Sequence, residues 1–315
     1  MKYAIVGSGA VGSIIADYLV QAGKEVTAIA RGKHLQALQS NDGLRVMDPN
    51  GQTRQSPVPA TAAQDYEDVP DVVFVCVKDH SLESVYPFLE RVATPETTVI
   101  PLSNVYGTGD RIRAHLLTAK DAEAPLVTCG CVYCAGNIEA PGFLVKDREL
   151  CQVVYGMPEQ QDHLRALPRL SAICTDASHG NLDCKVSSDI RRDHLRKFAH
   201  VASVTATDII FGCTMGAIQG IPEVRLTFFN AVQEVQAVAQ AMGINLGDDL
   251  IDGNSKLVAT APASATTSCQ RDLEAGRPSE VNGLIRQVVT WGVSYGVPTP
   301  VFARASVVAR DRFGV

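Results

Sequence analysis

A lysine interrupts a stretch of sequence that is otherwise typical of a buried helix. Residues 195–210 read LRKFAHVASVTATDII, and small or apolar side chains recur at spacings of three and four on nearly all sides. Lys197 therefore either reaches water through its flexible stem or places a cation inside the protein. The periodicity alone does not decide between these two interpretations, so Lys197 is the first residue of the sequence that needs an explanation.

A glycine-rich motif stands near the N-terminus. The sequence GSGAVG follows a short apolar stretch and opens an apolar helix, which is the context in which G-x-G-x-x-G binds a dinucleotide. The first glycine makes the tight turn, the second lets the backbone approach the pyrophosphate, and the third lets helix and strand pack closely. The predicted cofactor residues here are Gly7, Ser8, Gly9, Ala10, Val11 and Gly12.

Two cations follow the second expected strand. Enzymes that use NAD place Asp or Glu there to hold the ribose hydroxyls. This chain has Arg31 and Lys33 instead, in the sequence ARGK. Arg31 is suited to a bidentate grip on a 2′-phosphate, with Lys33 as a second charge, so we expect NADP as the cofactor. The alternative is that both are solvated charges at the start of a helix.

Two polar residues follow later apolar runs. Lys78 comes directly after DVVFVCV, and Asn104 follows VIPLS. Ligands of parallel sheets bind at the carboxyl ends of strands, so both residues are candidates for binding the cofactor. Polar residues also begin ordinary loops at such positions.

Nine cysteines are scattered along the chain. An odd number of cysteines in a chain of this size favours reduced thiols, and we expect a cytoplasmic protein. Cys129, Cys131 and Cys134 form a cluster, but no second cysteine pair follows at the spacing of a zinc site. We therefore expect no metal, and the role of this cluster stays open.

Composition excludes several classes of protein. The net charge of −6 argues against a nucleic-acid binder, which needs a basic face for phosphates. No apolar run approaches the length of a membrane span, so we expect no membrane partner. The N-terminal MKYAIVGSGAVG has no small-residue cleavage site and is interpreted as a first strand, not a signal peptide.

The elements that carry these residues alternate between strand and helix in the first half of the chain. Strands are expected at 3–6, 25–30, 71–77, 97–102 and 127–134, with helices at 10–22 and 34–40. After a polar connection that runs into a helix and a weak strand before 189, the periodicity predicts helices at 190–209, 222–242, 247–261, 264–275 and 279–295. The fold class is α/β, with an N-terminal Rossmann-type doubly wound sheet (residues 1–186) and an all-α C-terminal domain (residues 187–315).

The whole chain resembles the ketopantoate reductase (2-dehydropantoate 2-reductase) family. The resemblance rests on GSGAVG, ARGKH, VFVCVK, LSNVYG, EAPG, the Arg196-Lys197 pair, DLEAGRPSEVNG at 272–283 and YGVPTP at 295–300. It implies NADPH-dependent reduction of a 2-oxo acid to a 2-hydroxy acid, most directly 2-dehydropantoate to pantoate in pantothenate biosynthesis. It also implies an active site between the two domains.

The resemblance also assigns site residues. Lys197 matches the family's catalytic lysine and Glu280 its substrate-binding glutamate, and both are expected to act in catalysis. Asn104 and Ser268 match further pocket residues, and Lys78 matches a lysine that lines the cofactor cleft. With Thr205, the expected substrate-binding set is Asn104, Lys197, Thr205, Ser268 and Glu280. The expected partner is the small-molecule substrate, and we also expect a homodimer.

Some family residues are missing. Asparagines that the family carries four and eight positions after the lysine are Val201 and Thr205 here, and another is Ala265. Two alternatives therefore stay open. One is a D-2-hydroxy acid dehydrogenase that acts on a more apolar 2-oxo acid. The other is a non-catalytic NADP-binding or redox-sensing protein, which the presence of Lys197 and Glu280 speaks against.

Overall fold

The structure is a computed structural model that describes residues 1–315, with the side chain of Ala122 left out. It divides into two compact units. The first comprises Met1–Ser103 and Gly107–Ile190, and the second comprises Asn104–Tyr106 and Arg191–Val315. The chain passes into the second unit between Ile190 and Arg191. The sequence did not predict that three residues of the first half of the chain would join the second unit.

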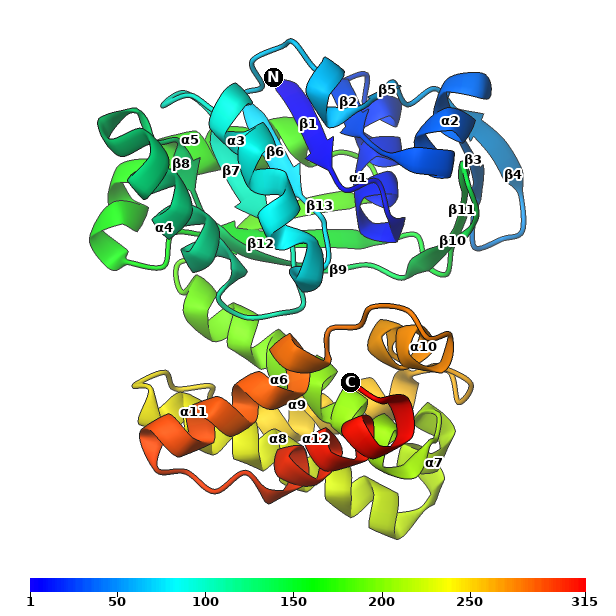
Figure 1. The fold of residues 1–315 in the computed structure, drawn as a ribbon, viewed down its shortest axis with the longest axis vertical. Helices are drawn as coiled ribbons and strands as arrows, with labels where there is room; N and C mark the ends of the chain where they lie inside the picture. The colour runs from blue at the N-terminus through cyan, green and yellow to red at the C-terminus, as the bar shows by residue number, and fades with distance from the viewer. The chain divides into compact units, whose positions relative to one another are not determined.

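A six-stranded parallel sheet forms the centre of the first unit (Figure 1). β-Branched runs such as VVFV build it, as is typical of strands that are buried on both faces. Its strands, in spatial order, are β5 (Ala60–Thr61), β2 (Glu25–Ile29), β1 (Lys2–Val6), β6 (Val72–Val75), β7 (Thr98–Pro101) and β8 (Leu126–Val127).

Helices cover both faces of this sheet. Alternate residues of β1 point to opposite sides: Tyr3 and Ile5 pack in the core with α1 and α5, whereas Ala4 and Val6 pack in the core with α3 and α4. This arrangement confirms the predicted doubly wound fold. The helices of this unit are α1 (Ala10–Gln21), α2 (Gly32–Ser40), α3 (Tyr86–Val92), α4 (Thr108–Lys120) and α5 (Gln160–Ala177), with 3₁₀ turns η1 (Ala63–Asp65), η2 (Asp79–Val85) and η3 (Asp121–Glu123).

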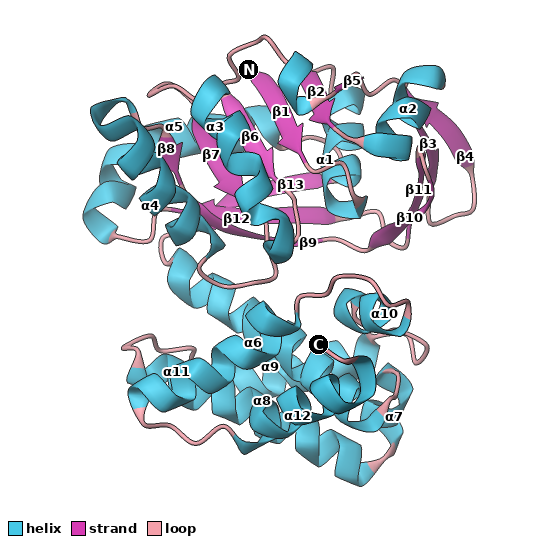
Figure 2. Ribbon diagram, viewed as in Figure 1, coloured by secondary structure: helices cyan, strands magenta, loops and turns pink.

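Two smaller sheets complete the first unit, and most of their strands were not predicted. A four-stranded mixed sheet has the order β10 (Gly136–Ala140), β11 (Phe143–Lys146), β3 (Leu44–Met47) and β4 (Thr53–Ser56). A three-stranded sheet has the order β13 (Leu182–Val186), β12 (Cys151–Gly156) and β9 (Cys129–Tyr133). Figure 2 shows both sheets as strands separate from the parallel sheet.

In residues 191–315 all regular elements are helices, which confirms the predicted all-α part (Figure 2). Its helices are α6 (Ile190–Phe211), α7 (Met215–Gly220), α8 (Pro222–Ala241), α9 (Leu250–Thr260), α10 (Ser268–Glu274), the π-helical turn η4 (Asn282–Arg286), α11 (Gln287–Tyr295) and α12 (Pro300–Phe313).

Two of the helical predictions for the second unit need correction, and two further helices of this unit were not predicted. The expected helix at 264–275 begins only at Ser268, because Thr267 caps it by accepting a hydrogen bond from the Gln270 N–H at 3.1 Å. The expected helix at 279–295 begins with a π-turn at Asn282. The helices α7 and α12 were not predicted from the sequence.

Candidate active site

The glycine loop between β1 and α1 has the geometry of a dinucleotide-binding turn. Gly7 has φ +91°, and a Cβ there would lie 2.7 Å from the Val77 side chain. A Cβ on Gly12 would lie 2.2 Å from the Gly7 carbonyl oxygen, so both positions require glycine. A Cβ on Gly9, by contrast, would meet no atom within 4 Å. This open backbone at the start of α1 fits the approach of a pyrophosphate.

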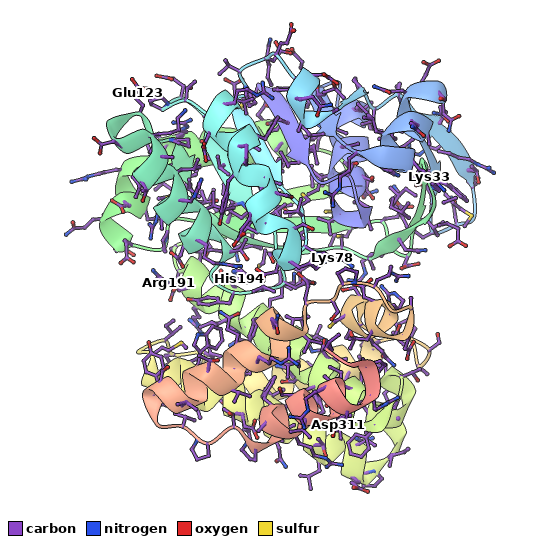
Figure 3. All side chains as sticks on the ribbon, in the orientation of Figure 1. Lys33, Lys78, Glu123, Arg191, His194 and Asp311 are labelled. Carbon is purple, nitrogen blue, oxygen red and sulfur yellow. The ribbon has the colours of Figure 1, made fainter. Side chains whose placement is uncertain are left out.

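Arg31 and Lys33 lie at the next strand end. Arg31 occupies the position before the first turn of α2, and both side chains are exposed. Figure 3 labels Lys33 on α2 in the first unit. Two exposed cations with no carboxylate between them suit a 2′-phosphate, so these residues fit NADP.

Lys78 lies beyond the end of β6. It is half-buried and follows Val77, the residue whose side chain approaches Gly7 (Figure 3). The first unit thus brings Lys78 to the same edge of the sheet as the glycine loop, as the sequence predicted for a strand end.

In the second unit, Lys197 is paired with Asn104. The Nζ of Lys197 donates a hydrogen bond to Asn104 Oδ1 at 2.8 Å, and Lys197 is only 9% exposed. Lys197 lies on α6, and Asn104 comes from the segment after β7, 93 residues earlier. The amide oxygen fixes the direction of the ammonium group without neutralising its charge.

Packing explains why Asn104 belongs to the second unit. Val105, the next residue, is buried in the core of this unit, and a Cβ on Gly283 would lie 2.5 Å from Val105 Cγ2. The Tyr106 ring lies 5.4 Å from that of His194 and 5.8 Å from that of Trp291. The contacts of Val105 and Tyr106 therefore hold this segment in the second unit.

Glu280 lies two residues before Asn282, where the π-turn that contacts Val105 begins. Glu280 is only 5% exposed, and its backbone oxygen accepts a hydrogen bond from the Leu284 N–H at 2.8 Å. π-Helical turns are rare and often occur at functional sites. Because Gly283 of this turn packs on Val105, the elements that carry Glu280 and Asn104 are in direct contact.

A histidine that was not predicted as a site residue lies beside Lys197. His200 lies one helical turn after Lys197, and its Nδ1 lies 2.9 Å from Asn254 Oδ1. The Asn254 Nδ2 donates to the Leu250 carbonyl at 2.8 Å, so Oδ1 faces the ring and Nδ1 carries the proton. Burial lowers the pKa of His200, and the charge of Lys197 lowers this pKa further. The imidazole of His200, next to Lys197, is therefore in its neutral form. In the sequence, only the spacing of three residues between Lys197 and His200 could have indicated that the two are neighbours.

The remaining predicted pocket residues, Ser268 and Thr205, differ in how deeply they are buried. Ser268 is half-buried at the first position of α10. Thr205 is fully buried, and its Oγ1 donates to the Val201 carbonyl at 2.8 Å. This hydroxyl is committed to its own helix. A role for Thr205 in binding substrate stays a prediction that requires the hydroxyl to turn away from Val201.

The cysteine cluster is divided between two cores of the first unit. Cys129 and Cys131 pack in a small core with Val154 and Ile190, whereas Cys134 packs against the main core of the first unit. The described residues contain no group of three or more His, Cys, Asp or Glu side chains that could hold a metal ion.

Comparison with known proteins connects both units to one family. The family model "Ketopantoate reductase PanE/ApbA" matches residues 3–154, and the model "Ketopantoate reductase PanE/ApbA C terminal" matches residues 189–311. The chain belongs to the ketopantoate reductase family. It is an oxidoreductase of that family.

Individual family members support this assignment. The chain is 27% identical to the 2-dehydropantoate 2-reductase of Mesorhizobium japonicum over 318 residues, which cover 95% of this chain and 94% of that protein. The crystal structure of a PanE/ApbA family ketopantoate reductase from Ralstonia eutropha aligns with a TM-score of 0.84 at 26% identity and covers 98% of this chain and 97% of the other.

A protein with another activity has a similar fold. The ternary structure of D-mandelate dehydrogenase with NADH and anilino(oxo)acetate aligns with a TM-score of 0.86 over the full length of both chains, at 21% identity. This similarity concerns the fold alone. Across the described part of the chain, no helix combines the length and the apolar character that crossing a membrane requires.

Proposed function

We propose that the protein is an NADPH-dependent 2-oxo acid reductase with 2-dehydropantoate, reduced to pantoate, as its substrate. The observation that carries the proposal is the buried hydrogen bond from Lys197 Nζ to Asn104 Oδ1. An ammonium group that donates one hydrogen bond to a neutral amide oxygen can still donate a proton to a substrate oxygen, which is what a general acid needs. A protein that only bound a dinucleotide would have no use for this arrangement.

The chemistry divides between cofactor and protein. Bound NADPH would supply the hydride that goes to the carbonyl carbon of the substrate. Lys197 binds the carbonyl oxygen electrostatically and donates its Nζ proton as negative charge develops there. Asn104 orients that Nζ. The buried carboxyl group of Glu280 accepts a hydrogen bond from a hydroxyl of the substrate.

Residues of the first unit would hold the cofactor. The backbone of Gly7, Ser8, Gly9, Ala10, Val11 and Gly12 would bind the pyrophosphate at the start of α1, and Arg31 and Lys33 the 2′-phosphate. Lys78 would contact the cofactor from the end of β6. The homodimer and the cytoplasmic location expected from the sequence remain predictions.

A second candidate is a D-2-hydroxy acid dehydrogenase that acts on a more apolar acid. It is favoured by the committed hydroxyl of Thr205, which donates to Val201 at 2.8 Å, and by the apolar side chains of Val201 and Ala265. A pocket with fewer hydrogen-bonding groups gains less from a hydroxylated substrate.

The test is NADPH oxidation, followed by absorbance, with a panel of 2-oxo acids. The panel contains 2-dehydropantoate, its deoxy analogue 2-oxo-3,3-dimethylbutanoate, 2-oxo-3-methylbutanoate and phenylglyoxylate. Turnover with 2-dehydropantoate at the highest kcat/KM supports the proposal. A clear preference for the apolar acids supports the second candidate, and no turnover with any 2-oxo acid rejects both.

A further inference from the structure

The four-stranded mixed sheet contacts α1 and α2, the helices that begin at the two predicted cofactor-binding segments, and nothing in the proposed function uses this sheet. Helix α1, which starts at the glycine loop, packs against β10, β11 and β4. Helix α2, which follows Arg31, contacts the turn between β10 and β11. Figure 1 shows β3, β4, β10 and β11 on the α2 side of the first unit.

The first attachment is an ion network on α1. Asp17 is fully buried and accepts hydrogen bonds from Arg54 at 2.8 and 2.7 Å, and Arg54 also pairs with Asp48 at 3.0 Å. Lys146 of β11, with a side chain only 1% exposed, lies 2.7 Å from Asp48 and 3.4 Å from Asp17. Buried charges of this kind are destabilising if one partner is removed. The network therefore fixes how the mixed sheet packs against α1.

The second attachment is at the start of α2. The backbone N–H of Gly142, in the turn between β10 and β11, donates to His34 Nδ1 at 3.1 Å. The Gly142 carbonyl accepts a hydrogen bond from the Arg45 N–H of β3 at 2.9 Å. Gly142 has φ +74°, and a Cβ there would lie 3.0 Å from Ala37 of α2. This close approach is the physical reason for the glycine in EAPG.

The hydrogen bond from Gly142 determines the state of the His34 ring. Because Nδ1 accepts a hydrogen bond, the neutral ring carries its proton on Nε2. That nitrogen is buried, and it makes no hydrogen bond of normal geometry within the described residues. Burial lowers the pKa of His34, and an interaction with the backbone of Ser8 in the glycine loop acts in the opposite direction. His34, in the first turn of α2, thus interacts with two further segments: the glycine loop and the turn that contains Gly142.

We propose that His34 is a positioning residue for the 2′-phosphate site, and that through it the mixed sheet holds the turn carrying Arg31 and Lys33 beside the glycine loop. Long exposed cations lose conformational entropy when they bind a phosphate. A backbone that is already fixed reduces the remaining cost of binding. The inference rests on the proposed function, since it assumes that Arg31 and Lys33 bind a 2′-phosphate.

Replacement of His34 by Asn or by Gln, whose amides are each isosteric with one side of the ring, distinguishes this role from a general packing role. The oxygen of Asn in His34→Asn lies near the position of Nδ1 and can still accept from Gly142. The amide of Gln in His34→Gln lies near the position of Nε2 and leaves the Gly142 N–H without its acceptor. Gln36→Leu, at an exposed position of the same helix, is the control.

The experiment measures the dissociation constants of 2′,5′-ADP and 5′-AMP by calorimetry, with thermal unfolding to verify that each variant is folded. We expect His34→Gln to weaken 2′,5′-ADP at least fivefold and to leave 5′-AMP within twofold, while His34→Asn and Gln36→Leu stay within twofold for both. Equal effects of the two His34 variants, an unchanged 2′,5′-ADP affinity in His34→Gln, or an equal loss for both nucleotides would overturn the proposal.

Arg31→Ala distinguishes the failure of this inference from that of the proposed cofactor. If Arg31→Ala does not weaken 2′,5′-ADP, the assignment of the 2′-phosphate site is wrong, and the role of His34 is rejected with it. If Arg31→Ala weakens 2′,5′-ADP and His34→Gln does not, the role of His34 alone is rejected.

Discussion

Lys197 and Asn104 come from distant parts of the chain and meet in a buried hydrogen bond of 2.8 Å. This contact depends on a short segment, Asn104–Tyr106, that leaves the first unit and packs into the second. Val105 anchors the segment against Gly283, and Gly283 belongs to the turn that follows Glu280. The contact between Val105 and Gly283 therefore controls the positions of two candidate site residues.

Gly283→Ala tests this control. The added Cβ would lie 2.5 Å from Val105 Cγ2 and 2.7 Å from Cγ1, so the segment that carries Asn104 must move. We expect kcat to fall at least tenfold, because small displacements of positioning groups have large effects on rate. Val105→Ala in the same protein should restore most of the loss. Gly253→Ala, where the nearest atom would be 3.9 Å away, is the control. Full activity in Gly283→Ala would contradict this account of how Asn104 is positioned.

Much of the fold could be predicted because its signals are local. The β-branched run at Val72–Val75 and the apolar periodicity of α6 each follow from a few consecutive residues. The strands β3 and β4 are short and partly polar, and β3 pairs with β11 almost a hundred residues later. Such pairing leaves no local pattern, so the mixed sheet was missed.

The residues of the candidate site also divide into those with a local signal in the sequence and those without one. The types and motif positions of Lys197 and Glu280 could be recognised in the sequence. The assignment of Asn104 to the second unit could not, because it depends on Val105 fitting against a glycine 178 positions away in the printed sequence. His34 lies within the ARGKH motif, but its link to Gly142 exists only in the folded chain.

The buried carboxyl group of Asp208 on α6 should make stability fall as pH rises. Burial raises its pKa to about 8, although Thr267 acts to lower it. Between about pH 4 and pH 8 the native protein holds a proton that the unfolded chain has released, so the free energy of unfolding decreases by up to about 1.4 kcal/mol per pH unit. Asp208→Asn removes this dependence. Urea unfolding from pH 5 to pH 8 should show the two proteins diverging as pH rises, and parallel curves would refute it.

The substrate pocket should discriminate weakly against a missing hydroxyl. Val201 and Ala265 provide no hydrogen-bonding side chains, and the Thr205 hydroxyl donates to its own helix. We expect kcat/KM for 2-dehydropantoate and for 2-oxo-3,3-dimethylbutanoate to agree within about tenfold, or 1.4 kcal/mol. A thousandfold preference for 2-dehydropantoate would mean that other residues bind the hydroxyl.

NADPH should be preferred over NADH by at least tenfold in kcat/KM, because Arg31 and Lys33 are exposed at the start of α2 with no carboxylate between them. Arg31→Ala should reduce this ratio, since charge-assisted hydrogen bonds to phosphate are stronger than neutral ones. Steady-state kinetics with both cofactors measure it. Equal kcat/KM values in the unaltered protein would show that the 2′-phosphate is not recognised.

The role of Lys197 as proton donor is the central claim, and its most direct test is the kcat of Lys197→Ala for NADPH-dependent reduction of the preferred 2-oxo acid. The control is Lys256→Ala, which removes an exposed lysine from α9. Thermal unfolding of both variants verifies that they are folded. The account predicts that Lys197→Ala lowers kcat about a hundredfold or more while Lys256→Ala retains full activity. Near-normal turnover in a folded Lys197→Ala protein would contradict it.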